Sequence, residues 1–163
     1  MENETINEAG LTTLITRGGV YYQAPGTNPR EILTNLVERL NPPSVVDRDA
    51  LLKAVLEREA LMTTAVGHGI ALPHPRNPLI SGAGDQFVAV AFLEHPVDWQ
   101  ALDGEPVHTA LLIVSSSAKL HLHTLSRINY FCQQEQFRAF LAKRPTPEDI
   151  IRVITEAEAA WQV

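Results

Sequence analysis

The sequence predicts a single α/β domain with a central mixed β-sheet flanked by helices. The chain has 163 residues, and at roughly 150 residues per domain this length suits one domain with one sizeable core. Two apolar segments, 87–93 and 107–114, are of the type that forms buried strands. Segments with apolar residues at helical spacing lie before and after them. This interspersed order is typical of helices packed against one sheet.

Turn and capping residues divide the first third of the chain. Residues 1–10 are polar and are expected to form a flexible N-terminus, which leaves 11–163 as the domain. Residues 20–22, between two glycines and a Pro-Gly pair, predict a short strand. A helix is predicted from the N-cap Asn28, because a proline follows in the first turn and apolar residues repeat on one side as far as Leu40.

The middle of the chain is predicted to contain a second helix, an irregular segment and the two strands. The helix starts near Asp47 and ends near Met62. The segment 67–78 has two glycines and three prolines in twelve residues, so it is not helical throughout. An Asp-Gly pair at 103–104 predicts a turn between the two buried strands.

Three helices are predicted after the strands. The serines at 115–117 offer N-caps for a helix that extends to about Phe131. A shorter helix covers 135–142. Thr146 caps a last helix whose first turn contains Pro147, and the following apolar residues recur at helical spacing.

Composition excludes several classes of function. The chain has 13 Lys and Arg against 19 Asp and Glu, a net charge of −6 with neutral histidines, which disfavours nucleic acid and anionic membrane as partners. A single cysteine cannot form an internal disulfide and does not suit most structural zinc sites. The start lacks the features of a signal peptide, and no apolar run approaches the ~20 residues that span a bilayer. A cytoplasmic protein without membrane insertion is expected, and its six histidines are the feature to explain.

His74 lies between two prolines. Each proline fixes its own φ and drives the preceding residue to extended geometry, so the backbone from Leu72 to Pro75 is expected to be stiff and extended. Such a segment suits a side chain presented to a ligand better than one in a core. A cation, Arg76, follows. Two interpretations stay open from the residues alone: a functional histidine, or an ordinary histidine in a surface loop.

His121 is expected in the first turn of the helix that begins after the serines. At 100° per residue it points to the same side as the apolar Leu125 and Ile128. A histidine there is either a satisfied residue at the edge of the core or a donor aimed at a phosphate near the helix start. His123 is close in sequence, but on a helix the two rings point about 200° apart, so a shared metal site is not expected.

Arg58 lies at the edge of the apolar stripe of the second predicted helix. An arginine there needs an anionic partner, because burial of an unpaired charge is costly. The partner is either a ligand or the neighbouring Glu59. Cys132, on the buried side of the third predicted helix, is interpreted as an inert core thiol.

Two stretches carry a resemblance to a known family. They are Arg58-Glu59, Thr64 and Gly67-His68-Gly69-Ile70-Ala71-Leu72-Pro73-His74 in the first stretch, and His121-Leu122-His123-Thr124-Leu125 in the second. Together they resemble the signature of enzyme IIA domains of the mannitol, fructose and nitrogen type, from the bacterial phosphoenolpyruvate-dependent phosphotransferase system. The resemblance covers roughly residues 11–160.

The resemblance implies an enzyme IIA fold and a phosphotransferase component that needs neither a cofactor nor a metal. It implies that His74 is the phosphoacceptor, that His121 is the second active-site histidine and that Arg58 is the arginine of the signature. Thr64 would help to position the phosphate. The donor would be a phosphohistidine carrier protein similar to HPr, and the acceptor an enzyme IIB or a regulatory protein.

Two functions stay open under this resemblance. The first is sugar uptake, in which the phosphoryl group passes from His74 to an enzyme IIB. The alternative is a nitrogen-type regulatory module whose His74 phosphorylation state controls binding to partner proteins. A third hypothesis outside the resemblance, metal-dependent hydrolysis, ranks last. The chain departs from the family pattern at Ser115 and at Pro75, and the latter removes a backbone N–H beside the phosphate.

Overall fold

A computed structural model describes residues 10–41, 46–80 and 82–161, so the N-terminus predicted to be flexible, 1–10, lies outside the described residues apart from Gly10. Within the described part, one five-stranded sheet has the order β1-β4-β5-β3-β2. Its strands are β1 (Val20–Ala24), β4 (Phe87–Val97), β5 (Val107–Val114), β3 (Ile70–Ala71) and β2 (Ala65–Gly67). The pairs β1–β4 and β3–β5 are parallel, whereas β4–β5 and β2–β3 are antiparallel. The sheet is therefore mixed, as predicted.

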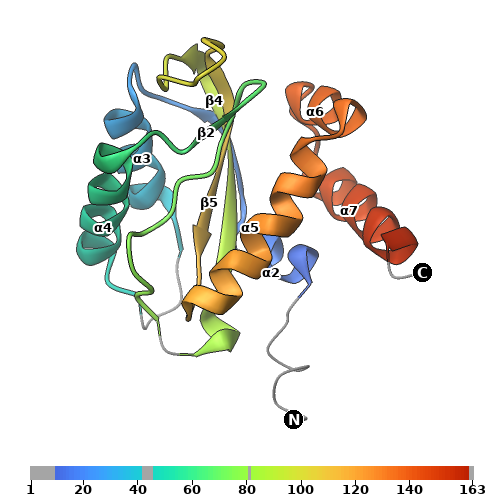
Figure 1. Ribbon diagram of the computed structural model, residues 1–163, viewed down its shortest axis with the longest axis horizontal. Helices are drawn as coiled ribbons and strands as arrows, with labels where there is room; N and C mark the ends of the chain where they lie inside the picture. Colours follow the sequence, from blue (N-terminus) through green and yellow to red (C-terminus); the bar gives the residue numbers. More distant parts are fainter. Residues whose placement is uncertain (1–9, 42–45, 81, 162–163) are drawn as a thin grey trace.

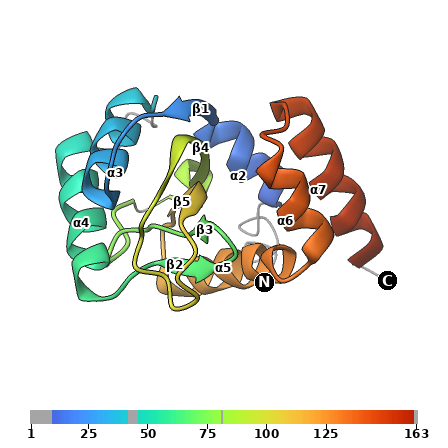
Figure 2. The same cartoon turned by 90° about the horizontal axis from the view of Figure 1, so that it is seen from above.

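Helices cover both faces of the sheet (Figure 1). One face packs against α3 (Pro29–Arg39) and α4 (Arg48–Leu61). The other face packs against α2 (Leu11–Gly18), α5 (Ala118–Cys132), α6 (Glu135–Ala142) and α7 (Pro147–Trp161). Figure 2, seen from above, shows the sheet lying between these two groups of helices. The predicted α/β domain with a sheet flanked by helices is confirmed.

The side chains of β4 alternate between the two cores. Those that join the core with α3 and α4 are Phe87, Ala89, Ala91 and Leu93. Those that join the opposite core are Val88, Val90 and Phe92. All are buried. Because successive strand residues point to opposite faces, a strand covered on both sides is apolar without interruption, and this explains why the segment was recognisable as a buried strand.

Capping hydrogen bonds confirm the predicted helix starts. The Asn28 side chain accepts a hydrogen bond from the Glu31 N–H at 2.9 Å, and the Glu31 carboxylate accepts one from the Thr27 N–H at 2.8 Å. The Asp47 side chain accepts from N–H groups in the first turn of α4. The Ser117 hydroxyl accepts from the first turn of α5. Each side chain satisfies a backbone donor that has no partner within its helix.

Four elements differ from the sequence prediction. The short strands β2 and β3 are not predicted, because β3 is held by pairing with the distant β5 and β2 by pairing with β3. The helix α2 is not predicted, because its N-cap Gly10 makes no side-chain capping bond and four of its eight residues are held by burial against the sheet and α7. Strand β4 extends past its predicted end, through the exposed Pro96 to Val97. Its pairing with β5 is interrupted after Phe92 and resumes at Val97. A proline is tolerated at such an irregularity, because no N–H is needed there.

The helices are short. The longest in the described part are α5 and α7, each of 15 residues. Among the described residues no helix has both the length and the apolar composition needed to cross a bilayer.

Candidate functional site

The backbone around His74 is held on both sides. The Pro73 carbonyl accepts a hydrogen bond from the Ile113 N–H at 3.0 Å, which attaches the segment after β3 to β5. The Arg76 N–H donates to the Ala54 carbonyl at 3.3 Å, which attaches the same segment to α4. These contacts, with the flanking prolines, hold the His74 backbone between the sheet and a helix.

The ring of His74 has a defined tautomer. Its Nδ1 atom lies 2.8 Å from the Leu72 carbonyl oxygen. Because a carbonyl only accepts hydrogen bonds, we assign the proton to Nδ1, which leaves the lone pair on Nε2. Burial lowers the pKa of His74, and the Arg58 charge lowers it further, while the Leu72 hydrogen bond and the Glu59 charge oppose them. The net lowering keeps the ring neutral at pH 7, so Nε2 is available as a nucleophile.

His121 lies beside His74, on the first turn of α5. The two ring centroids are 4.5 Å apart and the rings are inclined by 42°. Burial, together with the neighbouring His74 and Arg58, lowers the pKa of His121 to about 4. The ring is therefore neutral at pH 7 and offers one N–H donor. The structure brings together two histidines that lie far apart in the sequence.

Arg58 stands on the last turn of α4, opposite His121. Its Nη1 atom donates to the Met62 carbonyl at 2.7 Å. The Glu59 carboxylate instead accepts two hydrogen bonds from Thr64, so the alternative of an internal Arg58–Glu59 pair is wrong. A guanidinium has five N–H donors, and those not directed at Met62 remain available to an anion beside His74.

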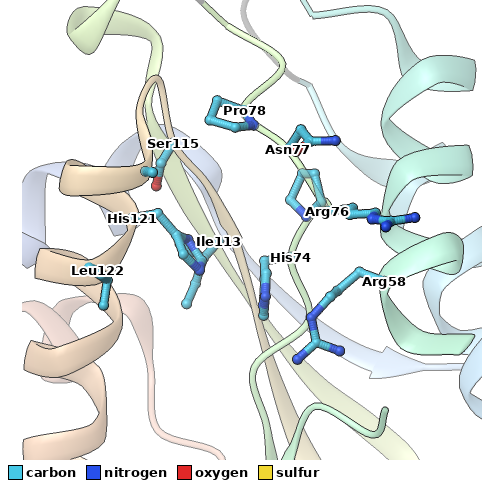
Figure 3. A pocket seen from close by; sticks show the side chains of 11 residues that line it. Arg58, His74, Arg76, Asn77, Pro78, Ile113, Ser115, His121 and Leu122 are labelled. Atoms are coloured by element: carbon cyan, nitrogen blue, oxygen red, sulfur yellow. The ribbon is translucent and has the colours of Figure 1, made fainter. Parts of the chain in front are cut away.

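Three of the four predicted site residues, His74, His121 and Arg58, line one pocket of about 270 Å³. Figure 3 shows His121 from α5 and Arg58 from α4 on opposite sides of His74. This volume is many times the roughly 10–15 Å³ that a cavity needs to hold one water molecule, so the pocket has room for a phosphoryl group beside His74, His121 and Arg58.

Eight lining residues are absent from the predicted site residues. They are Pro75, Arg76, Asn77, Pro78, Ile113, Ser115, Ala118 and Leu122. Ser115 is one of the three serines predicted as N-caps of the helix that carries His121, and Ala118 directly follows them, so this position could have indicated both. Ile113 enters the site because β5 passes beside the His74 segment, and its apolar side chain gives no such signal.

Thr64 occupies a different position from the other three predicted residues. It is buried and does not line the pocket. Its hydroxyl donates to Glu59 Oε1 at 2.6 Å and its N–H to Glu59 Oε2 at 2.8 Å. The hydroxyl proton of Thr64 is therefore directed at Glu59 and not into the pocket, and its role in positioning a phosphate stays a prediction.

The comparison with protein families decides the identity of the domain. The sequence model of the family described as "Phosphoenolpyruvate-dependent sugar phosphotransferase system, EIIA 2" matches residues 6–157. The chain belongs to this family. The stretch from Arg58 to His74 is therefore part of an EIIA 2 domain, and the resemblance stated from the sequence is confirmed.

Two relatives illustrate the range of proteins that contain an EIIA 2 domain of this kind. A protein named "Nitrogen regulatory protein" from Pseudomonas aeruginosa is 31% identical, over 91% of this chain and 96% of its own length. The "PTS system fructose-specific EIIABC component" of Bacillus subtilis is 26% identical over 90% of this chain, which spans only 23% of that relative.

Solved structures share the fold of this EIIA 2 domain. The nitrogen regulatory protein IIA-Ntr of Neisseria meningitidis has a TM-score of 0.73 and 23% identity, over 92% of this chain and 99% of that one. IIA mannitol of Escherichia coli has a TM-score of 0.63 and 17% identity, over 83% of this chain and 94% of that one. At these identities the comparison establishes the fold.

One group of metal-ligand type lies elsewhere among the described residues of the EIIA 2 domain. The ligand atoms of the exposed His68, Asp103 and Glu105 lie within 4.8 Å of one another. Both Asp103 oxygens already accept backbone hydrogen bonds, from His68 at 2.8 Å and Glu105 at 3.0 Å, which lower the pKa of Asp103. These bonds explain the group as a structural contact that joins the turn between β2 and β3 to the connection between β4 and β5.

Proposed function

We propose that this EIIA 2 domain is a phosphocarrier of the regulatory kind. His74 accepts a phosphoryl group from a phosphohistidine carrier protein, and its phosphorylation state controls binding to partner proteins. The single observation that supports the accepting role is the free Nε2 of His74 in one pocket with His121 and Arg58. The regulatory role is supported by the similarity to the Pseudomonas aeruginosa nitrogen regulatory protein, which extends over almost the whole of that protein.

The chemistry is an in-line transfer between two imidazole nitrogens. The lone pair of His74 Nε2 attacks phosphorus and forms an N–P bond, while the N–P bond of the donor breaks and its electron pair returns to the donor imidazole. Nδ1 keeps its proton and its hydrogen bond to Leu72. The phosphorylated ring is then positively charged, and its phosphoryl group is an anion in the pocket.

Arg58 and His121 stabilise the transferred group. The guanidinium offers a forked, permanently charged donor, and the neutral imidazole offers one N–H near the start of α5, where the helix dipole favours an anion. Each charge-assisted hydrogen bond contributes about 1–3 kcal/mol. Because Pro75 has no N–H, these two side chains carry more of the neutralisation than they would beside a residue with a backbone donor.

Sugar uptake is the second candidate function. It is supported by the similarity to the fructose-specific relative of Bacillus subtilis, whose EIIABC chain is far longer than the matching segment. In this function the phosphoryl group passes from His74 to an enzyme IIB. The accepting chemistry is the same, and only the recipient differs.

A labelling experiment tests the accepting role. The protein is incubated with radiolabelled phosphoenolpyruvate, enzyme I and the phosphohistidine carrier protein. We expect one acid-labile phosphoryl group per chain in the wild type, none in His74→Ala, and wild-type labelling in the control His95→Ala, whose residue is exposed. An unlabelled wild type, or full labelling of His74→Ala, would contradict the proposal.

A second experiment separates regulation from transport. Partner proteins are captured on the phosphorylated protein, the unphosphorylated protein and His74→Ala, and the phosphorylated form is also mixed with purified enzyme IIB components. Regulation predicts a partner that distinguishes the phosphorylated form from the other two. Transfer of the label to an enzyme IIB, with identical partners for all three forms, would instead establish the transport function.

A further inference from the structure

Arg58 and Glu59 are consecutive on α4, yet their side chains make different contacts. Arg58 donates to the Met62 carbonyl and lines the His74 pocket. Glu59 is half-buried and holds Thr64 with both carboxylate oxygens, at 2.6 and 2.8 Å. Arg58 therefore lies on the pocket side of His74, whereas Glu59 is directed at the chain that leads into β2.

Glu59 is connected to His74 by three consecutive sets of hydrogen bonds. Its carboxylate accepts the N–H and the hydroxyl of Thr64. The Thr64 carbonyl accepts from the Leu72 N–H at 3.0 Å. The Leu72 carbonyl then accepts the Nδ1 proton of His74 at 2.8 Å. The position of the Leu72 carbonyl, and with it the orientation of the imidazole, therefore depends on a chain of contacts that begins at Glu59.

We propose that Glu59 is a positioning residue for phosphoryl transfer, which acts through Thr64 and Leu72 to keep the His74 ring protonated at Nδ1 with Nε2 facing the pocket. Its importance for transfer rests on the proposed accepting role of His74. The orientation of the ring is a property of the unphosphorylated protein and is tested independently.

The negative charge of Glu59 also favours a proton on the His74 ring, in addition to the effect of its hydrogen bonds on the orientation of that ring. Of the two charged side chains that influence the protonation of His74, Arg58 disfavours a cationic ring and Glu59 favours it. A ring that carries both the Nδ1 proton and a phosphoryl group on Nε2 is cationic, so a carboxylate on this side supports the phosphorylated state, while Arg58 faces the phosphoryl oxygens.

The predicted effect of substitution depends on how much of the contact is kept. Glu59→Ala removes both acceptors and leaves the buried Thr64 N–H without a partner. Glu59→Gln keeps one acceptor for that N–H, and its amide can donate to the Thr64 hydroxyl. Thr64→Val removes only the hydroxyl contact. Glu57→Ala, an exposed glutamate on the same helix, is the matched control.

Two measurements test the proposal. Nitrogen-15 NMR of the imidazole gives the tautomer of His74, and the initial rate of labelling from the phosphorylated carrier protein gives the transfer. We expect Glu59→Ala to lose the Nδ1–H preference and about 10- to 100-fold in rate, as misplacement of a reacting group does. Glu59→Gln should keep the tautomer and most of the rate, and Glu57→Ala should match the wild type.

Several outcomes would overturn the proposal. A folded Glu59→Ala with the wild-type tautomer and rate would do so, as would a Glu59→Gln as defective as Glu59→Ala in both measurements. If Glu59→Ala does not fold, Thr64→Val decides: we expect a smaller shift of the tautomer in the same direction, and an unchanged tautomer overturns the proposal. If the wild type accepts no phosphoryl group, the accepting role fails while the NMR measurement still decides whether Glu59 positions the ring.

Discussion

Acidification should destabilise this domain in part through His121, and His121→Gln should remove that part. Burial, together with the neighbouring His74 and Arg58, lowers the pKa of His121 in the folded state to about 4, from an ordinary value of 6.5. The unfolded chain therefore binds a proton at a higher pH than the folded chain does. By linkage, the contribution of this group to stability is fully present above pH 6.5 and is lost as the pH falls from there towards 4.

The size of the loss follows from the pKa difference. Each unit of difference corresponds to about 1.4 kcal/mol, so a lowering from 6.5 to about 4 corresponds to about 3 kcal/mol in the free energy of unfolding. The ring is only partly buried, and solvent screening reduces this figure. We expect His121 to account for ~2 kcal/mol of destabilisation across this pH range.

Urea denaturation at about pH 7.5 and about pH 4.5 measures the effect. The wild type should lose ~2 kcal/mol more than His121→Gln between the two pH values, because glutamine does not titrate. His123→Gln, on the same helix, should behave as the wild type does. Equal losses in the wild type and His121→Gln would refute the lowered pKa of His121, and an NMR titration of that ring gives an independent test.

Three further substitutions have defined outcomes. Arg58→Gln should slow labelling of the protein about 10- to 100-fold, since it removes ~1–3 kcal/mol of charge-assisted hydrogen bonding; a wild-type initial rate would exclude a role for the guanidinium. Gly69→Ala should lower the free energy of unfolding by about 1–3 kcal/mol, because φ is +82° and the added Cβ would lie 2.4 Å from His108 Cδ2. Gly18→Ala should cost about 1–3 kcal/mol, because its Cβ would lie 2.1 Å from the Val88 carbonyl oxygen. Urea denaturation checks both glycine variants, and unchanged midpoints would contradict the close contacts.

Local signals account for the elements that the sequence predicts correctly. The caps Asn28 and Ser117 act within one helical turn of themselves, and the unbroken apolar run of β4 reflects cover on both faces. By contrast, α2 has a glycine N-cap without a side-chain bond and depends on packing against distant elements. The continuation of β4 past Pro96 likewise depends on pairing with β5, which no local pattern reveals.

In the candidate site, too, some features follow from local sequence and others depend on tertiary packing. The stiff backbone at His74 follows from its flanking prolines, so its presentation was predictable from physical principles. The distance of 4.5 Å between the ring centroids of His74 and His121 depends on where β3 and α5 lie along β5. Only the family resemblance indicates that the two rings lie close together. The hydrogen bonds from Glu59 to Thr64 also arise from tertiary structure, since they link the end of a helix to the chain that enters β2.

The strand order has a consequence for the order in which parts of the protein fold. The β4–β5 pair is antiparallel and joined by a short connection, so it closes with little loss of chain entropy. The parallel pairing of β3 with β5 joins segments farther apart in sequence and is expected to form later on the folding pathway. The His74 segment leaves from the end of β3, so its pocket is completed only when this late step has occurred. We therefore expect partly folded chains to be poor phosphoryl acceptors, and phosphorylation to mark molecules that have completed folding.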